Sequence, residues 1–293
     1  MRRLKLFTAL SITVSTAIPF IFKLIFPSMI SLVWIVVLLS SAISFAVLST
    51  LIAARNLYFL AGSIPHSALF SASFAMLISF IMGGSSFVWS LLINTALILA
   101  VGYVIHSGAD PNKVTSIFVG MTASLTVTVL YYLVNHFYVA KSITSEILGD
   151  PFLSTTADAY ISLASLAFTL IAFFYSYREN ILIGLLGRES WLSGINVYLH
   201  DYVFYLLLAV VSASFMKVIG FILTHIFILI PGAIASIAAE RSNEAVSMAL
   251  GMSLLSASIG LVAGIALNLS PAGITGIIMM IIYVLLVLMK KVK

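Results

Sequence analysis

The sequence contains no cysteine and very little charge. Of its 293 residues, none is Cys and only 8% are Asp, Glu, Lys or Arg. Without cysteine the chain can form neither a disulfide bond nor a thiolate metal site. With so few charges and 62% hydrophobic residues, it lies far outside the range of soluble proteins. The chain is therefore expected to be an integral membrane protein.

Motifs for nucleotide binding and for intramembrane proteolysis are also absent from the sequence. GxxxxGK[ST] does not occur, and no lysine follows a glycine in a phosphate-binding arrangement. There is neither an HExxH motif nor an aspartate pair within an apolar run. We therefore expect a transport protein rather than an enzyme, without a cofactor of its own. If ATP drives the transport, another subunit must bind the nucleotide.

Carboxylates are missing from the middle of the apolar runs. All nine Asp and Glu residues map to loops or to the ends of these runs. A proton- or sodium-coupled carrier usually places an acid near the middle of the bilayer. This pattern weighs against a secondary carrier that acts alone, although such a carrier, or a channel, stays an alternative.

What the sequence does contain is a series of long apolar runs, with a mean hydropathy of +1.21 over the chain. Runs of about 20 residues predict membrane-spanning helices rather than the short alternating strands of a barrel. We expect an all-α fold, a polytopic transmembrane helical bundle of about 8–10 spans that forms one membrane domain over residues 1–293. The runs lie near residues 6–26, 28–53, 58–82, 86–105, 114–139, 158–177, 199–219, 221–235, 246–268 and 272–289. The eighth is short and is interpreted as one half of a broken helix.

The basic residues predict the orientation of the chain in a plasma membrane. They are dispersed at the ends of the apolar runs and form no patch, so we expect no nucleic-acid partner. With both termini in the cytoplasm, only Lys23, Lys141 and Lys217 lie outside. The basic residues that then lie inside are Arg2, Arg3, Lys5, Arg55, Lys113, Arg178, Arg188, Arg241, Lys290, Lys291 and Lys293. This distribution follows the positive-inside rule.

The first apolar run has two interpretations. Its charged start and apolar middle are typical of a secretory signal, for which 15–17 would be the cleavage site. The run continues to Phe22, however, which favours a first span that is retained.

Two histidines are the ionisable residues that remain inside apolar runs. His66 lies early in the third run, beside Pro65, and His225 lies in the short eighth run. Neutral imidazole binds borderline transition-metal ions, so two histidines that face one cavity can relay a divalent cation. In the alternative, each ring bonds a hydroxyl or carbonyl group of a neighbouring helix. The other three histidines lie at span ends, which favours a solvated, structural role for His106, His136 and His200.

The segment GFILTHIFILIPGAIASIAAER, residues 220–241, combines an apolar stretch with a Pro-Gly step and a charged end. Proline and glycine at the end of an apolar run stop or kink a helix. We therefore expect a joint at Pro231 and Gly232, followed by a short helix outside the membrane core. Such a helix offers a surface to another protein.

Several of these segments resemble the permease subunits of ABC importers for zinc, manganese or iron, also called the ABC type-3 family. The resemblance rests on residues 220–241, on Arg55 with the 63–69 segment SIPHSAL, on 146–158, and on 268–273 at the entry to the last span. In the family pattern an aspartate precedes the first histidine by four residues, and this sequence has Gly62 there.

The resemblance implies an ABC importer permease fold and a transported divalent metal ion. It also implies partners: a second permease subunit, most simply an identical copy, cytoplasmic ATPase subunits that bind ATP, and an external metal-binding protein. His66 and His225 would then line the path of the ion. The residues that would couple the path to the ATPases are Pro231, Gly232, Ala235, Ser236, Ala239, Glu240 and Arg241. The runner-up is a permease for a vitamin, siderophore or haem, which shares the ten-helix plan.

Overall fold

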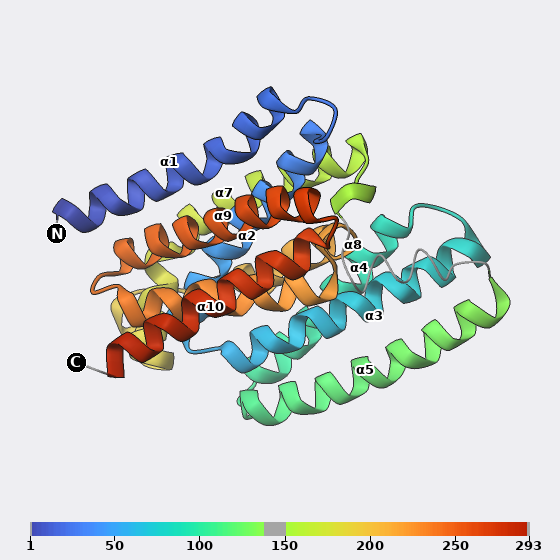
Figure 1. Ribbon diagram of the computed structural model, residues 1–293. Coiled ribbons are helices and arrows are strands. Elements are labelled where there is room, and N and C mark those ends of the chain that lie inside the picture. Colours follow the sequence, from blue (N-terminus) through green and yellow to red (C-terminus); the bar gives the residue numbers. More distant parts are fainter. Residues whose placement is uncertain (1, 138–150, 292–293) are drawn as a thin grey trace.

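The protein consists of long helices arranged as a bundle (Figure 1). The computed structural model describes residues 2–137 and 151–291, and this part of the chain contains helices and turns but no strand. The helices are α1 Arg2–Ile25, α2 Leu32–Arg55, α3 Tyr58–Met82, α4 Ser86–His106, α5 Pro111–His136, η1 Pro151–Leu153, α7 Thr156–Leu186, η2 Gly187–Ser193, α8 Val197–Ala238, α9 Ser242–Leu267 and α10 Pro271–Lys291. The predicted all-α class is confirmed.

Eight helices in the described part of the chain are long and apolar enough to cross a membrane, namely α2 to α5 and α7 to α10. The protein is therefore a multi-pass membrane protein. Helix α1 has a shorter apolar stretch, Ile12–Ile25. Each of the ten predicted runs overlaps one of these helices, and the seventh and eighth runs are the two halves of α8. The predicted resemblance over 146–150 lies outside the described residues.

Helix α8 is too long for a single membrane crossing. Its 42 residues would extend about 63 Å as a straight helix, about twice the thickness of the hydrocarbon core. One residue inside it, Gly220, has non-helical dihedral angles, φ 72° and ψ 174°. Residues other than glycine almost never adopt this conformation. The chain changes direction at Gly220, which divides α8 into two halves.

The predicted helix break at Pro231 and Gly232 is wrong. Helix α8 continues through both residues and ends at Ala238, so 233–238 is its last part and not a separate short helix. The reason lies on α2, where the Ser49 hydroxyl accepts a hydrogen bond from the Gly232 N–H at 2.7 Å. The same hydroxyl donates to the Leu229 carbonyl at 3.4 Å. A proline is tolerated in a membrane helix where a neighbouring helix satisfies the backbone around it.

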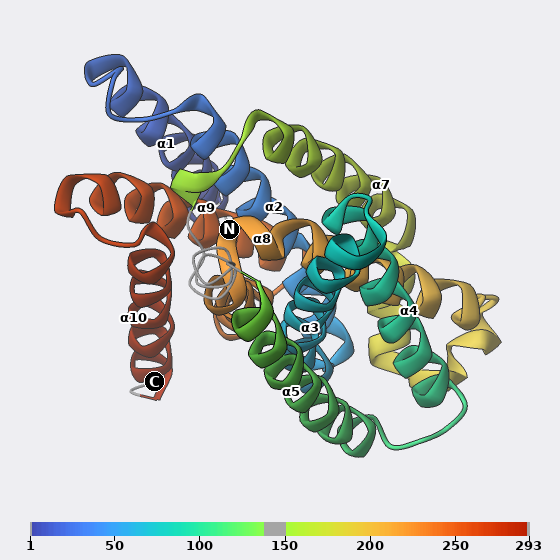
Figure 2. The same cartoon turned by 90° about the vertical axis from the view of Figure 1, so that its right-hand side faces the viewer.

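Helices α2 and α8 lie in the interior of the bundle, whereas α1 and α5 lie on its outer edges (Figures 1 and 2). Phe45 of α2 packs against Phe215 and Phe227, one from each half of α8, with ring centroids 5.8 and 6.4 Å apart. Both halves of α8 are therefore held against the same helix. This arrangement places the second half of α8 between α2 and α3. The candidate site lies where this half of α8 meets α3.

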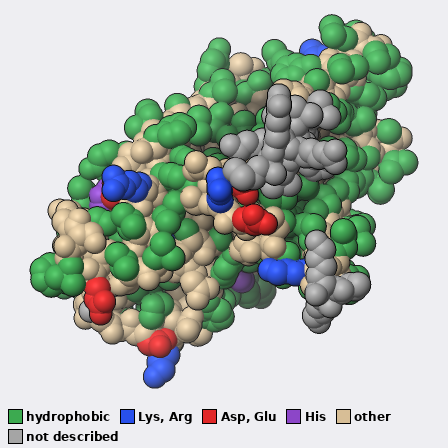
Figure 3. Space-filling model, turned by 90° about the vertical axis from the view of Figure 1, so that its left-hand side faces the viewer, with side chains coloured by type: hydrophobic (Ala, Val, Ile, Leu, Met, Phe, Trp, Pro, Cys, Tyr) green, Lys and Arg blue, Asp and Glu red, His purple; other side chains and the backbone are tan. Residues whose placement is uncertain are grey.

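Ion pairs join helix ends at opposite sides of the bundle. Asp201, near the start of α8, pairs with Arg55 at the end of α2 and with His106 at the end of α4. At the other side, Lys217 pairs with Asp158 near the start of α7, at 3.1 Å. The first half of α8 therefore runs antiparallel to α2, α4 and α7. The end of the bundle that carries both termini and the α8–α9 connection exposes Lys, Arg, Asp and Glu side chains, surrounded by hydrophobic ones (Figure 3).

Candidate functional site

The structure brings His66 and His225 together. His66 lies in the third turn of α3, and His225 lies five residues after the break in α8. Their imidazole rings meet edge to face, with centroids 5.1 Å apart. The ring of Phe221 packs against both, at 5.0 Å from His66 and 4.4 Å from His225. All three side chains are half-buried, so the pair lies at a surface of this chain.

Hydrogen bonding orients the ring of His225. Its Nδ1 lies 3.1 Å from the carbonyl oxygen of Phe221, one turn earlier in the same helix. Because a carbonyl only accepts, Nδ1 carries the proton, and in a neutral ring Nε2 keeps the lone pair that a metal ion needs. A partner of this kind is typical of metal-binding histidines. The Phe221 contact lies within α8, but the ring of His225 also contacts the backbone of Gly62 on α3, which is the bond to a neighbouring helix that the alternative describes.

The position one turn before His66 is occupied by Gly62, which has no side chain and therefore provides no side-chain ligand for a metal ion. The backbone carbonyl of Gly62 lies beside the ring of His225. Within residues 2–137 and 151–291, no group of three or more His, Asp or Glu side chains could hold a metal ion. The candidate site therefore consists of two imidazoles from one chain.

His66 is held in place by a polar residue that the sequence reasoning missed. Asn94 of α4 is fully buried, and its side-chain oxygen accepts a hydrogen bond from Ser67, the neighbour of His66, at 2.9 Å. The amide nitrogen of Asn94 donates to the Ala209 carbonyl and to the Ser212 hydroxyl, both at 2.9 Å. These bonds tie α3 and α4 to the first half of α8. An asparagine inside an apolar run is the signal that could have pointed to this role.

The remaining histidines lie at helix ends and are hydrogen-bonded. His106 Nδ1 lies 3.0 Å from an Asp201 carboxylate oxygen, and His136 Nδ1 lies 3.0 Å from the Tyr132 carbonyl. His200 Nδ1 lies 2.7 Å from the Ser176 hydroxyl, in a buried position. These contacts are structural, as expected, but the expected solvated position is wrong for His200, which is buried against the Ser176 hydroxyl.

A cavity of about 350 Å³ lies along α3 and α8, one helical turn from the histidine pair, and neither histidine lines it. Tyr58 lies one turn before Gly62 and Leu229 one turn after His225, and both line this cavity. The other lining residues are Phe59, Ile230, Ala233 and Tyr283. The cavity wall is apolar, so in this conformation it offers little to a hydrated ion.

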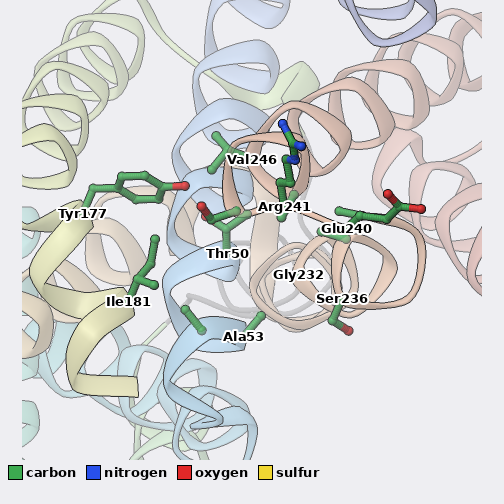
Figure 4. Close-up of a pocket in the computed structure, with 14 residues that line it drawn as sticks. Thr50, Ala53, Tyr177, Ile181, Gly232, Ser236, Glu240, Arg241 and Val246 are labelled. Atoms are coloured by element: carbon green, nitrogen blue, oxygen red, sulfur yellow. The ribbon is translucent and has the colours of Figure 1, made fainter. Parts of the chain in front are cut away.

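A second cavity, a groove of about 270 Å³, opens at the end of α8 (Figure 4). Six of the seven residues predicted to couple transport to an ATPase line it, namely Gly232, Ala235, Ser236, Ala239, Glu240 and Arg241. Pro231 is buried and is not part of the groove wall. The groove therefore gathers the predicted docking residues into one concave surface.

The opposite wall of the groove comes from residues that the sequence reasoning did not find. Thr50 and Ala53 of α2, Tyr177 and Ile181 of α7, and Val246 of α9 line it. In Figure 4 the charged ends of Glu240 and Arg241 point away from Tyr177 and Ile181, so the groove has an apolar interior and a charged rim. These wall residues lie within or next to ordinary apolar runs, and nothing in their local sequence separates them from packing residues.

Comparisons with known proteins agree with this architecture. A sequence profile of the ABC 3 transport family matches residues 25–291. The manganese transport system membrane protein MntC of Listeria innocua is 23% identical over 239 residues, and that of Listeria monocytogenes is 22% identical over the same length. Each alignment covers 81% of this chain and 82% of the relative.

Two solved structures have a similar fold. PsaBC from Streptococcus pneumoniae in complex with Fab superposes with a TM-score of 0.74 at 17% identity, over 91% of this chain and 94% of that one. A structure described as a metal-chelate type ABC transporter in an inward-facing conformation gives a TM-score of 0.70 at 12% identity, over 98% and 99%. At these identities the likeness concerns the fold, and it confirms the expected ABC permease architecture.

Proposed function

The chain belongs to the ABC 3 transport family, and we propose that it is the transmembrane permease subunit of an ATP-driven importer for a divalent metal ion: zinc, manganese or iron. The observation that carries this proposal is the contact between His66 and His225 on the surface formed by α3 and α8. Imidazoles are the commonest protein ligands for transition metals, and polar rings inside an apolar bundle are costly without a function. The manganese relatives support the same substrate class.

The permease works with partners that supply energy and substrate. ATP is bound and hydrolysed by cytoplasmic ATPase subunits, which dock in the groove at the end of α8, against Ala235 to Arg241. Both termini of the permease lie on that cytoplasmic side of the plasma membrane, in agreement with the distribution of basic residues. An external metal-binding protein delivers the ion to the opposite side, and a second, identical permease subunit faces the histidine pair across the path.

Movement at the groove reaches the histidines through α8. His225 lies on the second half of α8, which ends at the groove, whereas His66 is tied through Ser67 and Asn94 to the first half. Gly220 joins the two halves. When the ATPases close, they push on 239–241, and the second half of α8 turns about Gly220. His225 then moves relative to His66, and access to the pair changes from outside to inside.

A permease for a vitamin, siderophore or haem is disfavoured by the same surface. Such substrates need a large apolar cavity without imidazole, whereas here two imidazoles meet and the apolar cavity one turn away along α3 and α8 is small, about 350 Å³. A secondary carrier is disfavoured because the acids map to helix ends and loops rather than to the middle of the spans.

The test is metal uptake in cells that carry the complete set of subunits. We expect uptake of at least one of zinc, manganese and iron to require this chain and the ATP-hydrolysing activity of its partner. A matched strain carries an ATPase subunit that binds but does not hydrolyse ATP. Uptake that continues without this chain, or metal movement by the purified chain alone, would refute the proposal.

A further inference from the structure

We infer that this permease carries zinc, or an ion with the same preference for nitrogen ligands, and discriminates against manganese. The inference rests on the proposed function, because it concerns the site in which the transported ion is held. It differs from what the manganese relatives would suggest on their names alone. The reason is the chemical composition of the surface around His66 and His225.

The side chains next to the two histidines carry no charge. On α3, the residues one turn before and after His66 are Gly62 and Phe70, and on α8 those around His225 are Phe221 and Leu229. Their i±3 neighbours are also neutral: Ser63, Leu69, Ile222 and Ile228. Among the residues that the structure describes, no carboxylate joins the pair to form a three-ligand group. The site thus offers neutral nitrogen and backbone oxygen.

This donor set separates metals. Neutral imidazole suits zinc, copper, nickel and iron, whereas manganese, like magnesium and calcium, prefers carboxylate, carbonyl and water oxygens. On a nitrogen site, manganese binds most weakly of the first-row divalent ions from manganese to zinc. A hydrated manganese ion that enters this site would lose water without gaining an anionic ligand. Zinc would gain the ligands that it uses most often in proteins.

Two imidazoles do not complete a zinc site, and the partly exposed rings leave the pair accessible to ligands from a second subunit. His66, His225 and Phe221 are each half-buried in the single chain. An identical copy related by a two-fold axis would present the same surface, because a two-fold interface uses one patch on both subunits. Four imidazole nitrogens would then surround the ion, which matches the tetrahedral coordination that zinc prefers.

Gly62 provides a way to change the preference. A Cβ atom added at Gly62 would meet only the Leu229 Cδ1 atom, at 4.0 Å, which is an ordinary van der Waals contact. The backbone of Gly62 is helical, so a side chain causes no strain there. An aspartate at this position lies one helical turn before His66, on the same face of α3. It would add a carboxylate to the imidazole pair without displacing the backbone.

The experiment is equilibrium binding of zinc and of manganese, each as the metal alone, to the purified full-length protein in detergent. For the unaltered chain we expect bound zinc that excess manganese does not displace. Gly62→Asp should strengthen manganese binding about tenfold or more, in the range over which neighbouring groups tune metal affinity. Gly62→Asn is the matched control, since it has nearly the same shape without the charge, and it should leave manganese binding weak.

The outcomes separate the inference from the proposed function. Manganese binding equal to or tighter than zinc binding in the unaltered chain would overturn the inference and leave a metal importer in place. A gain of manganese binding in Gly62→Asn as large as in Gly62→Asp would also overturn it, because charge would then not be the cause. Metal binding that survives His66→Ala and His225→Ala together would overturn it by showing that the ion is held elsewhere. The proposed function fails by a different result, namely metal uptake by cells that does not depend on the chain.

Discussion

The backbone N–H of Gly232 donates a hydrogen bond of 2.7 Å to the hydroxyl of Ser49 on α2. Both residues are fully or almost fully buried, and the contact lies beneath the groove where we place the ATPase. Helix α8 approaches α2 so closely here because Gly232 has no side chain. Below the groove, α8 and α2 are thus held in close contact. A partner that pushes on this part of α8 would therefore push on α2 as well.

Gly232→Ala should destabilise the protein. The added Cβ atom would collide with the backbone carbonyl and the hydroxyl of Ser49, and overpacking of this kind costs about 1–3 kcal/mol. Thermal unfolding of the purified protein in detergent would measure the loss. Gly120→Ala on α5 is the matched control, because nothing lies within 4 Å of an added Cβ there. If both variants unfold at the same temperature, the close approach of α8 to α2 is not a constraint.

Gly220→Ala should also lower stability, for a different reason. At φ 72° and ψ 174° the backbone of Gly220 is in a region that other residues avoid, and the strain costs about 1–3 kcal/mol. The same thermal unfolding measurement applies, again with Gly120→Ala as the control. A Gly220→Ala protein of unchanged stability would mean that the direction change in α8 does not need this conformation.

Asp201→Asn should be among the most damaging of the conservative substitutions. It removes the charge that pairs with Arg55, whose side chain is only 4% exposed, and it leaves that guanidinium buried without a counter-charge. Breaking a buried ion pair costs about 3–5 kcal/mol. We expect a large drop in the unfolding temperature or a failure to accumulate in the membrane. Asp110→Asn, at the exposed N-cap of α5, is the control and should be nearly neutral, since Asn caps helices as well as Asp.

The sequence was sufficient to predict the helical class and the positions of the spans, and to single out two particular histidines. Apolar runs of bilayer length determine helices strongly, because no other open structure satisfies its backbone in lipid. His66 and His225 stood out because an ionisable ring inside an apolar run has few structural explanations. Their proximity, in contrast, became visible only once α3 and α8 were placed side by side.

The position of the break in α8 could not be predicted from local rules. Pro231 and Gly232 are the stronger breakers in isolation, yet Ser49, far away in the sequence, supports the backbone there. Gly220 is followed by an apolar run that is typical of an ordinary helix. The conformation of Gly220 is set by the packing of both halves of α8 on α2. The far wall of the groove, including Tyr177 and Thr50, was missed for the same reason, since it arises from tertiary contacts.

Glu240 and Arg241 should couple ATP hydrolysis to transport. They form the charged rim of the groove and lie between the last turn of α8 and the start of α9. Replacing both with alanine should reduce metal uptake per ATP hydrolysed roughly tenfold or more, within the usual range of coupling between sites, while the permease stays in the membrane. Uptake and ATP hydrolysis would be measured together in the complete transporter.

The matched control for that variant is Glu189→Gln. Glu189 is exposed in η2, at the connection between α7 and α8, and it does not line the groove. It should leave coupling unchanged. A Glu240 and Arg241 double variant with normal coupling would show that the ATPase docks elsewhere on the permease.

The most direct test of the central claim is ATP-driven metal uptake into vesicles that contain the complete transporter, with His66→Ala and His225→Ala compared with the unaltered chain. Each substitution should reduce uptake about 10–100-fold, while ATPase assembly and the unfolding temperature of the permease stay close to those of the unaltered protein. His136→Ala, at an exposed end of α5, should leave uptake unchanged. Full uptake by the His66 and His225 variants would contradict the account, because the ion would then cross the membrane without the pair of imidazoles that meets between α3 and α8.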